Sequence, residues 1–524
     1  MDRYVRTFGE ESDIDAMDFF IANEESEYLI LDEKSDERDK ERDFNLQPDA
    51  RCGDIRESKE TYLKQDKVER RIWRNLLLLG VAFFVTFTAH DTYQSLQNVT
   101  DCNFGFSSLI VTHLSVIISA LILPNIVLRL VGIKWTVIGC ISCYIIYTLA
   151  NVHPQWYTVI PVSVLDGVVG APLWTSEGTY ISTSAFLFAE ATDETPDGVL
   201  GKFFGTFSAV YNLAGIISGI VSSVVYEKTL SNSDQGQEFG QAGIAKTCGA
   251  NFCWARETMY NTTAVQCSSV PLSTTAILVV TFAILSIMSV LLVVFLVDKL
   301  PGDKTASDTP CLSTTFATVH LWKDYRLWML VPIIFSGGLR TGIITLDFAK
   351  SYVSCGIGVE YIGYVSMANS IALVIAAFLT GRLAERIGRI SQLVFGMACD
   401  FALIIVMLVW QPGDLKSVYF FVSAAWGVTD ALIFVHIRSF VGILFPETLP
   451  AAFANFYLWT SLGTVVSFAM SLILCPAAKL CILMAIQLVA LALYIAMEYF
   501  HYKQKGSRCA NGTDVIPGQS NSDK

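Results

Sequence analysis

The chain has 524 residues, of which 53% are apolar or aromatic and only 16% are charged, and its formal net charge is −12. A soluble domain usually carries about 25% charged residues, so this composition is typical of a membrane protein. An acidic chain lacks the basic surface that neutralises phosphate, and therefore no nucleic-acid partner is predicted.

The negative charge is concentrated at the N-terminus. Residues Met1–Asp43 hold 16 Asp and Glu against 6 Lys and Arg, so the rest of the chain is nearly neutral. Such a segment buries too little apolar surface to offset the entropy of ordering, and residues 1–55 are predicted to form a disordered tail. Residues 56–74 are basic. The first apolar run begins near Asn75 and is too long for a cleaved signal peptide, which places the N-terminus in the cytosol.

Twelve apolar segments follow, each long enough to cross a bilayer core of about 30 Å as a helix. The sequence therefore predicts an all-α polytopic membrane protein. The predicted spans are 75–97, 106–129, 133–152, 155–180, 202–225, 273–297, 326–346, 361–380, 390–410, 418–440, 452–474 and 479–499.

Basic residues in short loops set the orientation, because cytosolic loops are enriched in Lys and Arg. Arg129 and Lys134 follow the second span, whereas the first two outer loops contain neither residue type. Both termini are therefore predicted to be cytosolic. The predicted domains after the tail are an N-terminal six-helix bundle (75–297, with an outer loop at about 226–272), a cytosolic linker (298–325), a C-terminal six-helix bundle (326–499) and a cytosolic tail (500–524).

Glycines recur at similar places in the two halves. Gly132 and Gly388 are 256 residues apart, and Gly215 and Gly463 are 248 residues apart. Near-constant offsets between six-helix halves indicate two bundles related by an axis along the membrane normal. This is the arrangement of the major facilitator superfamily.

The loop between spans eight and nine combines glycines, one acid and several arginines. Ion pairs and helix-end contacts from such a loop can lock neighbouring helices together on the cytosolic side. The alternative is an ordinary basic inner loop. The residues of this motif are Gly381, Arg382, Glu385, Arg386, Gly388 and Arg389. The matching loop of the first half, residues 128–134, lacks the acid, so any such lock is one-sided.

Several motifs of the apolar region resemble the uncoordinated-ninety-three family. They are His153–Pro161, Gly170–Trp174 with Thr179 and Tyr180, Ser351–Cys355, Ala451–Phe456, Gly132–Thr136 and Trp426–Asp430. The resemblance extends from about Asn75 to Tyr499 and implies a facilitator-like fold that acts on other membrane proteins. In this family a nematode member regulates a two-pore-domain potassium channel, and a vertebrate branch escorts nucleic-acid-sensing Toll-like receptors to endosomes. The chain is more similar to the branch of the channel subunit and its vertebrate A-type homologues.

Four ionisable residues lie inside predicted spans, where a charge at mid-bilayer costs at least about 2.5 kcal/mol on insertion scales. They are Asp91, Asp166, Arg340 and Asp430, in the first, fourth, seventh and tenth spans. The family resemblance implies that these spans line a central cavity. Two hypotheses remain open: Arg340 pairs with one of the acids and pins the two halves together, or the acids titrate and drive a proton-coupled cycle. Asp400 and His113 are expected to face other helices.

Five cysteines fall in predicted outer loops, where oxidation to disulfides is favoured. They are Cys102, Cys248, Cys253, Cys267 and Cys355. Their connectivity does not follow from the sequence, and an odd number leaves one unpaired. Two sequons on the outer side, at Asn98 and Asn261, are predicted glycosylation sites.

The acidic tail contains both an acidic-dileucine-like spacing and a tyrosine-based pattern. Sorting adaptors recognise such short extended peptides through two apolar anchors, which predicts adaptor binding and endosomal cycling. An apolar cluster in a solvated tail is the alternative. The residues are Glu25, Tyr28, Leu29, Ile30 and Leu31.

The leading hypothesis is a non-enzymatic accessory subunit that binds and regulates an ion channel in the plasma membrane, by resemblance a two-pore-domain potassium channel. The alternatives are a proton-coupled secondary transporter of a small solute and a trafficking chaperone for membrane receptors. The sequence contains no hydrolytic or metal-ligating constellation and no phosphate-binding loop, so no enzymatic activity, metal or cofactor is predicted.

Overall fold

The computed structural model describes residues 51–100, 104–231, 248–253, 272–300 and 316–510, and every regular element in these ranges is a helix. The chain forms two units, Met1–Arg70 with Pro301–Asp303, and Arg71–Leu300 with Lys304–Lys524. In the first unit, Arg70 pairs with Asp66 one helical turn away at 2.6 Å. The second unit holds the spans.

The N-terminal half of the second unit contains the helices that correspond to the first six predicted spans. They are α3 (Arg51–Thr100, shared with the first unit), α4 (Phe104–Val131), α5 (Ile133–Ala150), α6 (Trp156–Thr192), α7 (Pro196–Tyr211) with α8 (Leu213–Ser231), and α10 (Leu272–Leu296).

The C-terminal half corresponds to the other six spans. They are α13 (Tyr325–Gly342) with the π-helix η3 (Ile343–Ser354), α14 (Tyr361–Ile387), α15 (Arg389–Val409), α16 (Lys416–Leu444), α17 (Leu449–Ser471) and α18 (Pro476–Ala510). The predicted linker is partly helical, in α12 (Ala317–His320) and η2 (Leu321–Lys323).

The predicted all-α polytopic architecture is confirmed. Among the described residues, eleven helices are long and apolar enough to cross a membrane. The predicted eleventh span, α17, is not among them. It has 23 residues but carries polar side chains such as Asn455, Thr464 and Ser467, which are buried against other helices. Packed membrane helices tolerate such residues because their neighbours satisfy the polar groups.

Local sequence signals explain where several helices begin and end. Gly132 (φ 86°) and Gly388 (φ 83°) break the chain after the second span of each half in the same left-handed conformation, which glycine adopts at little cost. This supports the predicted repeat. At the start of α6, Gln155 and Thr158 form a reciprocal capping box. Pro196 occupies the first turn of α7, where its missing N–H is not needed.

The predicted loop between spans eight and nine is shorter than expected. Residues Gly381–Ile387 continue α14 as helix, and only Gly388 separates it from α15. Glycine at position 388 stops α14 because its positive φ is incompatible with a continuing right-handed helix. The arginines of the motif therefore lie on helix ends rather than in a turn.

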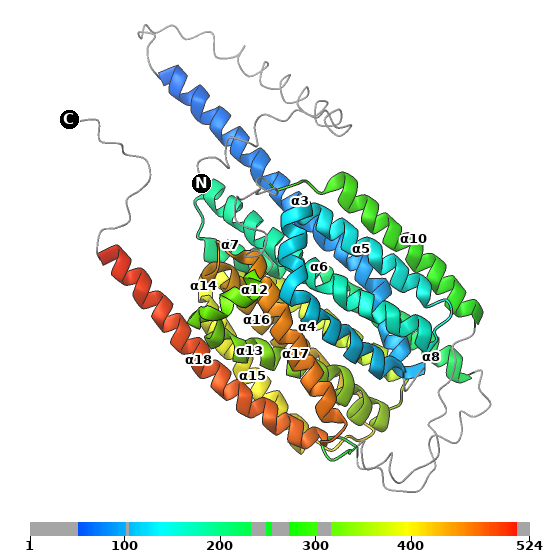
Figure 1. The fold of residues 1–524 in the computed structure, drawn as a ribbon. Coiled ribbons are helices and arrows are strands. Elements are labelled where there is room, and N and C mark those ends of the chain that lie inside the picture. Colours follow the sequence, from blue (N-terminus) through cyan, green and yellow to red (C-terminus); the bar gives the residue numbers. More distant parts are fainter. Residues whose placement is uncertain (1–50, 101–103, 232–247, 254–271, 301–315, 511–524) are drawn as a thin grey trace, which may run out of the picture. The chain divides into compact units, whose positions relative to one another are not determined.

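The two halves contact each other through several helix pairs, which include α6 with α17 and α7 with α16. In Figure 1, α4 runs beside α17, and on the other side α14 packs against α7 and α8. The backbones approach closely where glycines meet. A Cβ atom added to Gly363 of α14 would collide with the carbonyl oxygen of Gly219 on α8. Small residues at this position therefore permit the close contact between halves.

Candidate functional site

Buried charges of the C-terminal half form one network around Arg340. This arginine lies in the last turn of α13 and is 1% exposed. Its guanidinium lies 3.2 Å from Asp400 of α15 and forms a second ion pair with Asp430 of α16. Asp400 also accepts hydrogen bonds from Thr429, at 3.1 Å, and from Gln487. The predicted pairing of Arg340 with one of the candidate acids is present, with Asp430. All these residues belong to one half, however, so this pair does not pin the two halves together.

A second network lies in the N-terminal half around His90, a residue that was not predicted. His90 Nε2 lies 3.2 Å from Asp166 of α6, and Nδ1 lies 3.2 Å from the adjacent Asp91. The hydroxyl of Thr112 donates to Asp166 at 3.3 Å, and the ring centroid of Tyr144 lies 5.4 Å from that of His90. The imidazole thus connects the two predicted acids Asp91 and Asp166.

The two networks occupy equivalent places in the two halves. Each joins a basic side chain on the first span of a half to an acid on its fourth span, His90 to Asp166 and Arg340 to Asp430. The two networks differ in the nature of the basic group. Arginine stays charged at every accessible pH, whereas an imidazole can gain or lose its proton near neutrality.

Glu177 and Arg438 form an ion pair between the halves. Glu177 lies on α6 and is fully buried, and Arg438 lies on α16 and is 8% exposed. The Tyr457 hydroxyl of α17 donates to the same carboxylate oxygen at 3.4 Å. The guanidinium lies 4.7 Å from the ring centroid of Phe204 on α7. In the predicted orientation these contacts lie toward the cytosolic end, called the inner end below, and hold the halves together there.

The inner end carries a second ion pair between the halves, at one residue of the predicted loop motif. Arg389 lies 2.6 Å from Asp197 of α7 and 2.9 Å from Glu498 of α18. A cavity of about 210 Å³ adjoins it, and His436 is among the lining residues. Within the described residues, no other arginine of the motif pairs with the opposite half. Gly381 contributes to the contact between the halves by close packing, because it lies against the backbone of Gly201.

Asp298, just after α10, clamps the inner end of α3. It accepts hydrogen bonds from Arg71 at 2.6 Å, Arg74 at 2.7 Å and Asn75 at 3.2 Å. Partial burial opposes ionisation of the Asp298 carboxyl, but the hydrogen bond and charge of Arg71 outweigh it and lower its pKa below the ordinary value. The ionised carboxylate is therefore favoured in the folded protein.

This clamp predicts a pH dependence of stability. A carboxyl whose folded pKa is depressed stabilises the fold above its unfolded pKa, about 3.9, and loses that contribution as the pH falls through the folded value. The difference in melting temperature between the unmodified protein and Asp298→Asn is expected to be constant from about pH 7 to 5 and to shrink below about pH 4. A difference that grows on acidification would contradict this assignment.

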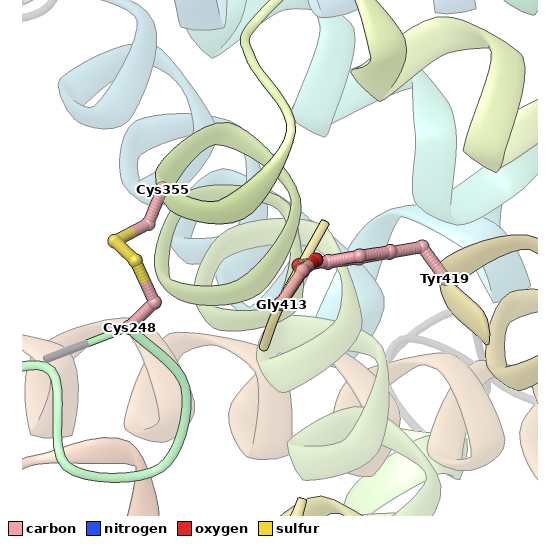
Figure 2. The surroundings of a disulfide bond; sticks show 4 residues. All are labelled: Cys248, Cys355, Gly413 and Tyr419. Carbon is pink, nitrogen blue, oxygen red and sulfur yellow. A yellow bond between two sulfur atoms is a disulfide. The ribbon is translucent and has the colours of Figure 1, made fainter. Parts of the chain in front are cut away.

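The outer end carries a segment that we call the outer strap, residues 248–253. Cys248 is bonded to Cys355 just after η3, and Cys253 is bonded to Cys475 just before α18. The N–H of Gly249 donates to the carbonyl of Ser351 at 2.8 Å. Figure 2 shows the first disulfide beside the end of η3. The strap thus comes from the predicted loop of the N-terminal half but is bonded to the C-terminal half.

The loop between α15 and α16 completes the surroundings of the strap. Gly249 has a positive φ of 90°, and a Cβ atom at this position would collide with Pro412. In Figure 2 the Tyr419 side chain reaches Gly413, whose carbonyl accepts its hydroxyl at 2.9 Å. Ala250 is buried in the same cluster as Tyr352. The strap is therefore packed as part of the C-terminal core.

Removal of one of the two strap disulfides is expected to destabilise the protein. Replacing Cys248 and Cys355 by serine removes a cross-link over 107 residues, and such a loss typically costs about 2–4 kcal/mol. Thermal unfolding with and without reductant measures the effect, and reductant is expected to destabilise the double variant less than the unmodified protein, because this variant still retains the Cys253–Cys475 disulfide. Cys481→Ser, which changes an exposed free cysteine, is the control. Equal stability of the double variant and the control would contradict the prediction.

Cys475 and another buried ion pair were not predicted. Cys475 lies in the short turn between the last two predicted spans, an outer position, but is not one of the five cysteines predicted to form disulfides. Nearby, Lys479 of α18 pairs with Asp347 of η3 and bonds to Ser471. Glu177, Arg438 and Lys479 all lie inside predicted spans. The criterion that selected Arg340, an ionisable residue inside a span, would therefore also have selected them.

Some predicted sites are outside the described residues. These are Asn261, Cys102, Cys267 and the tail residues Glu25, Tyr28, Leu29, Ile30 and Leu31. Asn98 lies in α3, and its side chain is also outside the described part. The same holds for the side chain of Glu385 in the loop motif. Within the described residues, no group of three or more His, Cys, Asp and Glu side chains could hold a metal ion.

The sequence of the helical region matches one known protein family. Residues 96–495 match the family described as "Ion channel regulatory protein UNC-93". The chain belongs to the UNC-93 family. This UNC-93 member is 31% identical over 443 residues to "Protein unc-93 homolog A" of Xenopus laevis, a match that covers 82% of this chain and 94% of that protein. The predicted family resemblance is confirmed.

A second relative is more distant. The UNC-93 member is 26% identical over 445 residues to the "Putative potassium channel regulatory protein unc-93" of Caenorhabditis elegans. This match covers 84% of this chain and 63% of the relative. Among solved structures, the facilitator superfamily transporter FucP in the outward conformation superposes with a TM-score of 0.58 at 12% identity, over 80% of this chain and 98% of FucP. The predicted major facilitator fold is confirmed.

Proposed function

We propose that this protein is a non-enzymatic accessory subunit that binds and regulates an ion channel. The family match over residues 96–495 carries this proposal, because the family is described as an ion channel regulatory protein. The name of the nematode relative supports a potassium channel as the partner. The motif resemblance described above narrows the partner to a two-pore-domain potassium channel, in the plasma membrane.

The contacts between the halves are compatible with a regulator that presents a fixed surface. Glu177–Arg438 and Arg389–Asp197 join the halves toward the inner end, and the disulfide-bonded strap covers the outer end of the C-terminal helices. A membrane partner binds such a preorganised surface with a smaller entropic cost than a mobile one.

Co-expression with a two-pore-domain potassium channel in oocytes tests the proposal. The potassium current is expected to differ from that of the channel alone, the protein alone is expected to carry no current, and the two are expected to co-purify. Arg389→Gln breaks an ion pair between the halves and is expected to alter the regulation. Glu447→Gln, which changes an exposed acid, is the control. An unchanged current without co-purification would refute the proposal.

A second candidate function is proton-coupled transport of a small solute. The His90–Asp91–Asp166 and Arg340–Asp400–Asp430 networks favour it, because intramembrane ionisable groups often mark proton and solute pathways. Uptake into reconstituted vesicles that depends on a proton gradient and disappears in Asp430→Asn would support transport. If no tested solute is taken up and the channel current is regulated, transport is excluded for these solutes and channel regulation is the function that remains.

A further inference from the structure

Side chains from segments that are distant in the sequence meet at the inner end of the N-terminal half. Arg71 and Arg74 of α3 both donate to the same carboxylate oxygen of Asp298, at 2.6 and 2.7 Å. The next residue, Lys299, holds its ammonium group 5.9 Å from the ring centroid of Trp135 in α5. Asp298 and Trp135 thus bring three basic groups to one place on the protein.

The helices that carry these groups pack against one another. α5 lies beside α10 (Figure 1), and Lys134 at the start of α5 donates to the carbonyl of Val294 in α10 at 2.9 Å. α3 is joined to α10 by the hydroxyls of Thr86 and Ser289, which are 2.9 Å apart. The basic residues therefore share one packed three-helix surface. They are Arg71, Arg74, Lys134 and Lys299, and we call them the inner basic cluster.

The charges of the inner basic cluster differ in arrangement from those of the C-terminal half. In the cluster, two arginines share one carboxylate oxygen of Asp298. At the inner end of the C-terminal half the ratio is reversed, because Arg389 faces two acids, Asp197 and Glu498. The enrichment of cytosolic loops in Lys and Arg accounts for basic residues at both places, but not for this difference. An anion is therefore attracted more strongly to the N-terminal half.

Arg74 and Lys299 are the members of the cluster that are best placed to bind an anion. The side chain of Arg74 is 47% exposed although it pairs with Asp298, and Lys299 is exposed. A guanidinium has five N–H donors and an ammonium group has three, so each can bond to more than one oxygen. Such charge-assisted hydrogen bonds to phosphate oxygens are among the stronger ones in proteins.

Large apolar side chains are exposed directly beside the cluster. Trp135 follows Lys134 in the chain and is 43% exposed, and Phe295 in the last turn of α10 is 73% exposed. Tryptophan favours the boundary between acyl chains and headgroups, where its ring is partly in each. The surface thus combines positive charge with an adjoining apolar area at the end of the membrane-spanning helices. This is the distribution that a negatively charged amphipathic molecule matches.

We propose that the inner basic cluster binds an anionic phospholipid of the cytosolic leaflet. The phosphate-containing headgroup contacts Arg74 and Lys299, and an acyl chain lies along Trp135 and Phe295. The bound headgroup joins the ends of α3, α5 and α10. The proposal goes beyond channel regulation, because this lipid site lies on the outside of the N-terminal half and requires neither a channel nor a transported solute.

Native mass spectrometry of the purified full-length protein, released from detergent micelles, tests the proposal. The probe is phosphatidylserine, and the zwitterionic comparison is phosphatidylcholine with the same acyl chains. The first phosphatidylserine molecule is expected to bind more tightly than phosphatidylcholine. Arg74→Gln and Lys299→Gln are each expected to weaken phosphatidylserine binding about fivefold, which corresponds to about 1 kcal/mol for each basic residue at a membrane surface.

The controls separate the site from general effects of charge and of folding. Lys323→Gln removes an exposed positive charge from the inner end of the other half, and an unchanged affinity is expected. Lys299→Arg keeps the charge and is expected to bind normally. Lys299→Gln leaves the hydrogen bonds of Arg71 and Arg74 to Asp298 in place, so weaker binding is expected without a change in melting temperature.

Three results would overturn the proposal. Equal affinities for phosphatidylserine and phosphatidylcholine would show that charge is not recognised. Equal weakening in Lys323→Gln and Lys299→Gln would show a diffuse attraction to the whole inner surface. Displacement of the lipid by an equal concentration of inorganic phosphate would show a site for a soluble anion instead. None of these results depends on whether a channel is regulated.

Discussion

Replacing Arg340 by methionine is expected to lower the stability of the folded protein by about 3–5 kcal/mol, the usual cost of breaking a buried ion pair on one side. The substitution leaves the buried Asp400 and the partly buried Asp430 without a cation, although Thr429 and Gln487 still hydrogen-bond to Asp400. Thermal unfolding in detergent, followed by loss of monodisperse protein on size-exclusion chromatography, measures the effect.

A matched variant and a compensating variant make this prediction specific. Arg382→Met removes an exposed arginine on α14 that pairs with no acid among the described residues, and a small change is expected. Adding Asp400→Asn and Asp430→Asn to Arg340→Met removes the uncompensated charges and is expected to recover most of the loss, because buried ion networks can often be replaced by neutral residues. Equal losses for Arg340→Met and Arg382→Met would contradict the assigned network.

The fold could be predicted from the sequence because the length of an apolar run is a local property. A run of about 20 apolar residues spans the bilayer whatever surrounds it. The glycine repeat could also be read directly from the sequence. Gly132 and Gly388 adopt the same left-handed conformation in the two halves. Helix ends were predicted less well, since α14 continues to Ile387 and the seventh span continues as a π-helix to Ser354.

The pairing of the charged residues could not be predicted from the sequence. Composition shows that Arg340 lies inside a span, but not that its partners are Asp400 and Asp430 from two other helices of the same half. His113 was noted inside a span, but His90 was missed, because its contact with Asp166 depends on how α3 packs against α6. The disulfide pairing of the strap could not be predicted either, because Cys253 pairs with Cys475 across 222 residues. Such pairings depend on tertiary packing.

Reversal of the charge at Arg438 is expected to open the inner end of the molecule. Arg438→Glu places two buried acids against each other across the halves, at Glu177 and position 438, where the unmodified protein has an ion pair. A lost buried pair costs about 3–5 kcal/mol, enough to shift a two-state equilibrium by more than a hundredfold. The contacts of α6 with α16 and α17 are therefore expected to separate.

A cysteine at position 182 reports the opening. Ser182 of α6 is fully buried, and its hydroxyl lies close to Gly442 of α16. In a background without the free cysteines, Ser182→Cys is expected to react with a thiol reagent at least about tenfold faster when Arg438→Glu is present. Glu177→Arg combined with Arg438→Glu restores an ion pair of opposite orientation and is expected to slow the reaction again.

The matched control reverses a charge whose partner lies in the same half. Arg326 pairs with Asp324 at 2.6 Å next to the start of α13, and Arg326→Glu breaks this pair without touching the contact between the halves. Labelling at position 182 is expected to stay slow. Fast labelling in both Arg326→Glu and Arg438→Glu would indicate general loosening of the fold, and the Glu177–Arg438 pair would then have no specific role in closing the inner end. Fast labelling in Arg438→Glu alone, with recovery in the double reversal, would establish that the pair between the halves controls access from that side.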